Sequence, residues 1–377
     1  MSTLLDAIIF NCNQKPEARD IDAQGIANLL WAMAKLVDDG QEQTPELKEA
    51  LAALLPHVDA QKANQQIRNN VRTTPLLKSD ALSELIRGEV LIKAESLQIT
   101  GAFKFRGAFY RLLNLTESQK KQGVTAYSSG NFAAGLSAAG QLLDIPVRLV
   151  MPHDAPKSKV NNARRYCAEV ILCQCNKPSR EEAASAMARQ IARDHGAVLL
   201  HPFDDHEIII GQASVALELQ EQLAMFGKSC DHILCPVGGG SLVAGSSLVF
   251  GSNTQVWAVE VDGYQGMGIS LENGRRSRAK GHILCDCDAL MALEPGIANL
   301  DIVLQTGVRG ITVNPQKSHD AIRRGFQEMN LVLEPSGAVA IAAIMDNPAL
   351  FENKTVVAIG SGGNVDPDKY AAILEAV

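Results

Sequence analysis

The chain has 377 residues, of which 46% are hydrophobic and 20% charged, and its formal net charge at pH 7 is −7. This composition is that of an ordinary globular protein, and the negative net charge disfavours nucleic acid and anionic membrane surfaces as partners. No apolar run approaches the roughly 20 residues of a membrane-spanning helix. The N-terminus carries no secretory signal, so we expect a cytoplasmic location.

The eight cysteines are too sparse for a disulfide scaffold, which agrees with a reducing compartment. Two pairs have the spacing C-x-C, namely Cys173 with Cys175 and Cys285 with Cys287. Zinc sites more often use the wider C-x-x-C spacing, and no matching histidine cluster accompanies either pair. We therefore expect no metal site at these cysteines.

Residues 1–56 are predicted to form a helical hairpin. One helix is expected over residues 22–37, where apolar residues recur at helical spacing, and a second over residues 45–55, bounded by prolines. Residues 26–36 resemble one unit of octatricopeptide-type helical repeats. A lone unit buries too little surface to be stable by itself. We expect it to pack on the rest of the chain, to pack across a homodimer or other homo-oligomer, or to recruit another protein.

From about residue 57 short apolar runs alternate with amphipathic helices, which is typical of a mostly parallel α/β sheet covered on both faces. Strands are expected at residues 89–94, 123–127, 146–151, 169–173, 197–201, 232–237, 255–261 and 355–359. Helices are expected at residues 60–69, 132–143, 156–166, 180–195, 211–226 and 242–250, and one from Phe103 onward.

Lys104 lies between two phenylalanines, and from Phe103 apolar residues recur at helical spacing, with Thr100 expected to cap the helix. In the first turn of a helix, both the helix dipole and apolar neighbours lower the pKa of a lysine amine. A lowered pKa is what a Schiff-base lysine requires. The alternative is a lysine whose stem packs on apolar surface while its ammonium reaches water.

Three small-residue loops follow predicted strands, at the carboxyl ends where open α/β sheets bind ligands. Residues 238–241, Gly-Gly-Gly-Ser, free the backbone to point several N–H groups at one anion, which favours a phosphate. Their spacing matches neither the dinucleotide fingerprint nor the P-loop. Residues 128–131 form a second loop that either binds an anion or caps a helix, and residues 360–364 form the third.

Segments spread along the chain, in order and with comparable gaps, resemble the serine/threonine dehydratases (threonine ammonia-lyases), with serine racemase as a close relative. These are fold type II (tryptophan synthase β-like) enzymes that depend on pyridoxal phosphate. The segments are residues 95–108, 128–131, 201–205 with 211–212, 238–241, 334–338 and 361–364. The resemblance covers about residue 57 to the end. It implies two mostly parallel open-sheet domains, a large one of residues 57–120 and 203–377 and a small one of about 121–202.

The resemblance also implies pyridoxal 5'-phosphate as the cofactor and a small amino acid as the substrate. Carried over position by position, Lys104 is the internal Schiff base and a catalytic acid/base, and Ser129 holds the second acid/base position on the opposite face. Asn131 binds the phenolic oxygen of the cofactor and Ser361 its pyridine nitrogen. The residues expected to bind its phosphate are Gly238, Gly239, Gly240 and Ser241.

The chain departs from the family pattern at several positions. Phe132 stands where the family has His, and Ala134 where it has Gln, which leaves the identity of the substrate open. Some relatives bind a divalent cation through a Glu and an Asp. Glu260 is present, but Gly266 occupies the second acidic position and Asp262 is the only nearby replacement, so no metal is predicted.

The expected reaction is α,β-elimination of water and ammonia from a β-hydroxy amino acid to give a 2-oxo acid. Serine, threonine, hydroxyaspartate and bulkier β-hydroxy amino acids all stay open as substrates. Two alternatives are racemisation of an amino acid, with Lys104 and Ser129 acting on opposite faces, and a binding protein that keeps the fold and the cofactor without turnover.

Overall fold

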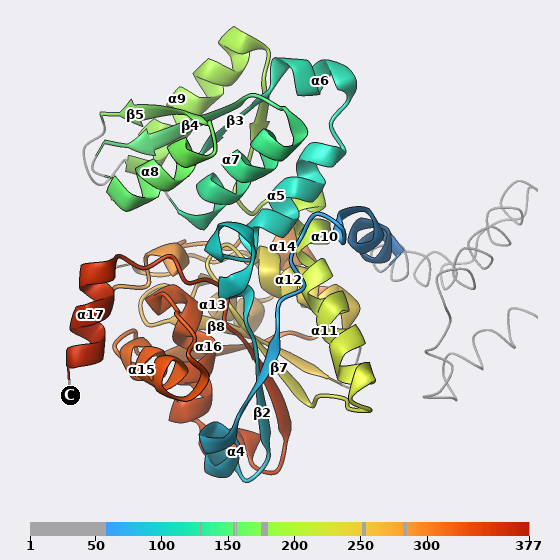
Figure 1. Cartoon of the computed structure of the whole chain (residues 1–377), viewed down its shortest axis with the longest axis vertical. Helices are drawn as coiled ribbons and strands as arrows, with labels where there is room; N and C mark the ends of the chain where they lie inside the picture. The colour runs from blue at the N-terminus through green and yellow to red at the C-terminus, as the bar shows by residue number, and fades with distance from the viewer. Residues whose placement is uncertain are drawn as a thin grey trace, which may run out of the picture. The chain divides into compact units, whose positions relative to one another are not determined.

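A computed structural model of the chain describes residues 58–128, 130–153, 155, 157–174, 180–250, 254–281 and 285–376. The predicted hairpin over residues 1–56, Cys175 and the predicted acid/base Ser129 lie outside this part of the chain. Ala63–Val377 form one compact unit, which carries both β-sheets (Figure 1). Within the described ranges, no helix has the length and apolar character needed to cross a membrane.

The larger sheet has six strands in the order β1-β2-β10-β7-β8-β9. β1 (Leu76–Ser79) pairs antiparallel with β2 at one edge, and all the other neighbours are parallel. The parallel strands are β2 (Glu89–Lys93), β10 (Thr355–Ile359), β7 (His232–Pro236), β8 (Gln255–Val261) and β9 (Arg309–Val313). β10 is rich in β-branched residues and almost wholly buried, because a parallel strand inside a covered sheet has no solvent face.

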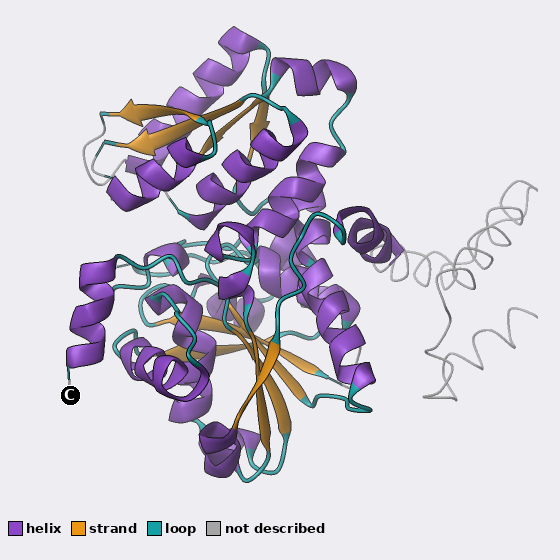
Figure 2. Ribbon diagram, in the orientation of Figure 1, coloured by secondary structure: helices purple, strands orange, loops and turns teal. Residues whose placement is uncertain are grey.

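The smaller sheet has four parallel strands in the order β5-β4-β3-β6. They are β3 (Val124–Tyr127), β4 (Val147–Pro152), β5 (Glu169–Cys173) and β6 (Val198–Leu200). The helices α7 (Asn131–Leu143), α8 (Lys157–Arg165) and α9 (Arg180–His195) connect these strands and pack on them. Figure 2 shows helices flanking the strands of both sheets.

The remaining described helices surround the six-stranded sheet or join it to the smaller one. They are α4 (Asp80–Ile86), α5 (Lys104–Leu113), α6 (Glu117–Gln122), α10 (His206–Gln212), α11 (Ser214–Met225), α12 (Ser241–Val249), α13 (Gly266–Asn273), α14 (Ile297–Gln305), α15 (Lys317–Met329), α16 (Pro335–Asp346) and α17 (Pro367–Glu375). A further helix runs over residues 58–67. Short 3-10 turns cover Glu95–Leu97, Ile99–Gly101, Asp288–Leu290 and Pro348–Phe351.

Two hydrophobic cores hold the sheets and helices together. α16 is rich in small residues, is buried over its first ten positions, and packs on β7, β8 and β10 in the core of the larger sheet. α5 and α7 pack on each other in the core of the smaller sheet. A Cβ on Gly135 of α7 would lie 3.0 Å from the backbone nitrogen of Phe105, so this glycine lets α7 approach the start of α5.

The predicted α/β fold with two mostly parallel sheets is confirmed, and the described strands other than β1 and β9 lie within one or two residues of their predicted positions. The single helix predicted over residues 211–226 was wrong. α10 begins at His206, because Asp205 caps it by accepting hydrogen bonds from the N–H groups of Glu207 and Ile208, and α11 begins at Ser214. β1, β9 and several helices were not predicted, and the division of the body into a large and a small domain stays a prediction.

Candidate active site

Lys104 is the first residue of α5, as the helical spacing predicted. Thr100 does not cap this helix, and that prediction was wrong. Thr100 lies inside the 3-10 turn Ile99–Gly101 with φ of +64°, and Phe103 occupies the cap position without a side-chain hydrogen bond. The chain makes this extra turn before α5, so Thr100 lies before the cap position and not at it.

The amine of Lys104 lies between two segments from later in the chain. Its Nζ donates to the carbonyl oxygen of Pro202 at 3.0 Å and to Oγ of Ser241 at 3.3 Å. It also lies 5.1 Å from the centroid of the Phe103 ring. Lys104 keeps some accessible surface, yet the protein packed around the amine lowers its pKa to about 7 by desolvation. A substantial fraction of the amine is therefore neutral, and nucleophilic, near pH 7.

The glycine loop predicted to bind phosphate connects β7 to α12. Gly240 has φ of +105°, a conformation that favours glycine. A Cβ on Gly239 would lie 2.1 Å from the Phe203 ring. Among the described residues, the N–H groups of Gly238, Gly239 and Gly240 have no hydrogen-bond acceptor. Unpaired N–H groups at the N-terminus of a helix, with Ser241 beside them, fit a phosphate group.

The third predicted loop lies against the segment that precedes Lys104. The N–H of Phe103 donates to the carbonyl oxygen of Ser361 at 3.2 Å, and Ala102 forms an antiparallel bridge with Gly362. Ser361 is a buried residue, and its hydroxyl makes no hydrogen bond to another residue in the described part of the chain. A serine hydroxyl that makes no hydrogen bond to the described residues fits a hydrogen bond to a polar atom of a cofactor.

Asn131 opens α7 and does not act as its cap, because Gly130 occupies the cap position. The Asn131 amide is held by two groups from the C-terminal part of the chain. Its Oδ1 accepts a hydrogen bond from Nδ2 of Asn364 at 2.9 Å, and its Nδ2 donates to Oε1 of Glu334. These contacts fix the side chain and leave one N–H of its amide free to donate to a ligand.

Glu334 is a polar residue of the site to which the sequence analysis assigned no role. It is buried, and burial raises its pKa to about 7. Besides the contact with Asn131, its N–H donates to the carbonyl oxygen of Gly362 at 3.0 Å. The motif at residues 334–338 was one of the segments that carried the family resemblance. However, Asn131, the partner of the Glu334 carboxyl group, lies 203 positions away in the sequence. Only the folded structure identifies that partner.

Phe132 and Ala134, which depart from the family pattern, lie in the first turn of α7. Both are buried, and Phe132 packs in the hydrophobic core of the smaller sheet. The replacement of a polar residue by Phe132 therefore adds apolar packing at the start of α7. The neighbouring Asn131 makes polar contacts with Glu334 and Asn364.

Glu260 is not arranged as a metal ligand. Its two carboxylate oxygens accept hydrogen bonds from the N–H groups of Met267 and Gly268, at 2.8 and 2.7 Å, at the start of α13. Burial raises its pKa to about 8. No group of three or more potential metal ligands occurs in the described ranges. In this arrangement the residues around Glu260 do not fit a divalent cation. Its carboxyl group instead accepts hydrogen bonds from N–H groups at the start of α13.

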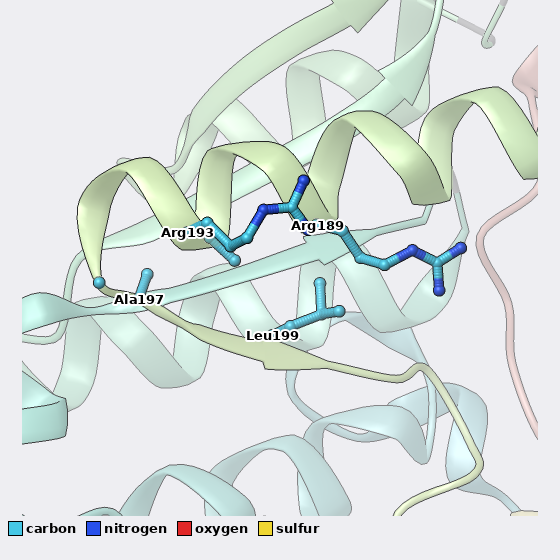
Figure 3. Close-up of a pocket in the computed structure, with 6 residues that line it drawn as sticks. Arg189, Arg193, Ala197 and Leu199 are labelled. Atoms are coloured by element: carbon cyan, nitrogen blue, oxygen red, sulfur yellow. The ribbon is translucent and has the colours of Figure 1, made fainter.

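A surface pocket of about 400 Å³ lies elsewhere, between α9 and β6. Its lining includes the side chains of Arg189, Arg193 and Leu199 (Figure 3). None of the predicted site residues lines it, so it is not part of the candidate site.

Fold and site together define a class of protein, namely an α/β protein in which a lysine of lowered pKa lies beside a glycine loop at the N-terminus of a helix. A family model described as pyridoxal-phosphate dependent enzyme matches residues 67–362. The L-threonine ammonia-lyase of Thermotoga maritima is 35% identical over 319 residues, which cover 84% of this chain and 77% of that protein. The β-hydroxyaspartate dehydratase of Paracoccus denitrificans is 33% identical over 327 residues, covering 82% of this chain and 96% of that protein.

The fold comparison agrees with these relatives. The structure of maize serine racemase matches with a TM-score of 0.77 and 29% identity, covering 83% of this chain and 95% of that one. The chain therefore belongs to the pyridoxal-phosphate-dependent enzymes of fold type II, as the motifs predicted, and its cofactor is pyridoxal phosphate.

Proposed function

We propose that the protein is a dehydratase that converts a β-hydroxy amino acid to a 2-oxo acid and ammonia. The observation that carries the proposal is the amine of Lys104, which has a lowered pKa and lies 3.3 Å from Ser241 at the glycine loop. Bound pyridoxal phosphate supplies a sink for the electrons of the α-carbon, and a neutral serine at its ring nitrogen makes that sink a weak one. A weak sink suits elimination, because the β-hydroxyl group leaves as the α-proton departs.

Each residue has one task in this proposal. Lys104 removes the α-proton of the substrate, and its neutral amine near pH 7 matches the requirement for a general base. Asn131 holds the phenolic oxygen of the cofactor and Ser361 its ring nitrogen. Ser129 serves as the second acid/base group. The phosphate is bound by Gly238, Gly239, Gly240 and Ser241.

Incubation of the purified full-length protein with L-serine, L-threonine and 3-hydroxyaspartate tests the proposal, with 2-oxo acid and ammonia measured together. We expect 2-oxo acid from at least one of them in the wild type and in Lys280→Ala, a control at an exposed lysine. Lys104→Ala should release none and should lose the visible absorbance of bound cofactor. A wild-type protein that binds the cofactor and releases no product from a wider panel would favour the binding-protein alternative.

Racemisation is the second candidate activity, and the similarity to maize serine racemase is the observation that favours it. It requires acid/base groups on both faces of the α-carbon, whereas elimination requires Lys104 alone to remove the proton. Measurement of D-amino acid in the same incubations distinguishes the two reactions. We expect Ser129→Ala to abolish any racemisation and to keep most of the elimination. A D-amino acid as the sole product would contradict the dehydratase assignment.

We also propose that residues 1–56 form a docking element without a catalytic task, and that the protein is a homodimer or other homo-oligomer. The family match begins at residue 67, so this segment lies outside the part shared with the catalytic family. Deletion of residues 1–56 followed by light scattering and activity assay tests both points. Retained activity and assembly would indicate recruitment of another protein, and loss of the oligomer would indicate packing between copies.

A further inference from the structure

Cys285 and Cys287 lie in one segment beside the candidate active site, on either side of Asp286. Cys287 is fully buried in the core of the larger sheet, whereas Cys285 is half-buried against that core. Both are free thiols. One sulfur is therefore open to small reagents and the other is protected from them.

The backbone brings the two thiols together. The chain bends at Asp286, whose carboxylate is held by Nε2 of His319 and by Nζ of Lys369, each at 3.1 Å. Two residues of fully extended chain span about 7 Å, just above the range of about 4.4–6.8 Å between Cα atoms that a disulfide requires, so a bend between two cysteines at this spacing favours a disulfide. The thiol of Cys287 donates to Oγ of Ser318 at 3.7 Å.

The two thiols differ in acidity in the way that a reactive and a resolving cysteine differ. Hydrogen bonding from Cys287 lowers the pKa of Cys285 to about 7, against the opposing effects of burial and of the nearby carboxylates. The same contact and burial raise the pKa of Cys287, which keeps its proton. In contrast, burial raises the pKa of Cys230 and of Cys235 to about 12. Only a thiolate reacts readily with peroxide, so Cys285 is much the more reactive of these buried or half-buried thiols.

We propose that Cys285 and Cys287 are a redox modification site that a hydroperoxide converts to a reversible intrachain disulfide. Cys285 first releases its thiol proton to solvent. The thiolate attacks one peroxide oxygen, the O–O bond breaks, and the departing hydroxide takes up a proton equivalent to the one released, which gives one water and leaves a sulfenic acid on Cys285. The sulfur of Cys287 then attacks the sulfenic sulfur as it loses its proton. The S–O bond breaks, and the departing hydroxide accepts that proton. Two thiols and one hydrogen peroxide thus give one disulfide and two waters.

The modified segment leads directly to the glycine loop. A Cβ on Gly238 would lie 2.7 Å from the carbonyl oxygen of Ala289, so the turn Asp288–Leu290 packs directly against the glycine loop. The N–H of Ala289 donates to Oγ of Ser336 at 3.0 Å, and Asp288 forms an ion pair with Lys159. Closing a ring between the cysteines changes the direction in which the chain enters this turn. We expect oxidation to weaken cofactor binding, an effect that rests on the proposed phosphate-binding task of Gly238.

Mass spectrometry on the full-length protein with its cofactor tests the modification itself. A tryptic fragment over residues 281–309 contains Cys285 and Cys287 and no other cysteine. One equivalent of hydrogen peroxide should lower its mass by about 2 Da, the two hydrogens lost on forming a disulfide, and dithiothreitol should restore it. Cys287→Ser should instead accumulate a sulfenic acid on Cys285 that dimedone traps. Cys167→Ser, at an exposed thiol, should behave as the wild type.

A wild-type fragment that is unchanged, or that gains oxygen on Cys285 without forming the disulfide, would overturn the proposal. The link to the active site has its own measurement, the dissociation constant of pyridoxal phosphate before and after oxidation. We expect it to rise by about 5-fold or more, the lower end of ordinary coupling between sites, in the wild type and not in Cys287→Ser. An unchanged constant in the fully oxidised wild type would overturn the link. Failure of the proposed function would show separately, as cofactor binding without turnover in the reduced protein.

Discussion

The interior of the protein contains a cluster of four charged side chains, one of them on α5. Loss of one carboxylate from this cluster should destabilise the protein strongly. The cluster contains Lys93, Glu95, Arg106 and Glu218, and the first three side chains have no solvent exposure. Glu95 accepts hydrogen bonds from Nε and Nη2 of Arg106 at 2.9 and 2.7 Å. Glu218 accepts from Lys93 and, at 3.1 Å, from Arg106. Two cations thus balance two carboxylates in the interior.

Glu95→Gln leaves two buried cations with a single carboxylate. Removal of one partner of a buried ion pair typically costs about 3–5 kcal/mol, and we expect the unfolding free energy to fall by that amount. Urea denaturation followed by circular dichroism measures it. Glu352→Gln is the matched control, because Glu352 pairs with Arg87 at the surface with side chains 45% and 78% exposed. A surface pair contributes about 0–1 kcal/mol.

The pH dependence of stability provides a second readout of the same variant. Burial tends to raise the pKa of Glu95, but Arg106 and Lys93 outweigh it and hold this pKa below its ordinary value. The ionised carboxylate therefore stabilises the fold above the unfolded-state pKa, and this stability is lost as the pH falls through the folded-state pKa. Glu95→Gln should flatten that loss. A variant that loses less than about 1 kcal/mol, or no more than the surface control, would refute the reasoning.

Three further predictions concern the site. In the protein freed of cofactor, the rate at which Lys104 reacts with an amine-specific reagent should rise with pH and reach half its maximum near pH 7, since burial lowers its pKa to about 7; a midpoint near 10 would contradict this. Gly239→Ala should weaken binding of pyridoxal phosphate and lower the melting temperature, because its Cβ would lie 2.1 Å from the Phe203 ring. The control Gly274→Asn should change neither, because Gly274 has a left-handed backbone conformation with no atom near its Cβ position. The unfolding free energy of Glu260→Gln relative to that of the wild type should rise as the pH rises from about 4.5 to 8, because burial raises the pKa of Glu260 and its ionisation therefore destabilises the fold. Urea titrations at several pH values measure this difference, and a difference that stays constant with pH would contradict the prediction.

Local patterns predicted the features that depend on neighbouring residues. Apolar runs placed the parallel strands other than β9, and helical spacing placed Lys104 in the first turn of α5. The glycines at 238–240 indicated a loop with unpaired N–H groups because glycine backbone conformation is a local property. Thr100 was misjudged for a related reason, since its side chain suits a cap but its left-handed backbone conformation was not readable from the neighbouring residues.

Contacts between distant segments were beyond the reach of such patterns. The pairing of Glu334 with Asn131 depends on the order of strands in two sheets, which short-range periodicity does not specify. The same holds for Phe203, which lies against Gly239, and for Glu260, whose carboxyl group binds α13. The family resemblance supplied candidate positions, and the structure shows which residues contact them.

The place of β10 in the larger sheet affects the order in which the two sheets can form during synthesis. The four strands of the smaller sheet all come from residues 124–200, so that sheet is complete when little more than half of the chain has been made. β2 and β7 of the larger sheet are separated by β10, which begins at Thr355. Domains fold as units during synthesis when their parts are available. We therefore expect the smaller sheet to fold first on the ribosome, because β2 and β7 of the larger sheet are joined only by β10, the last strand of the chain.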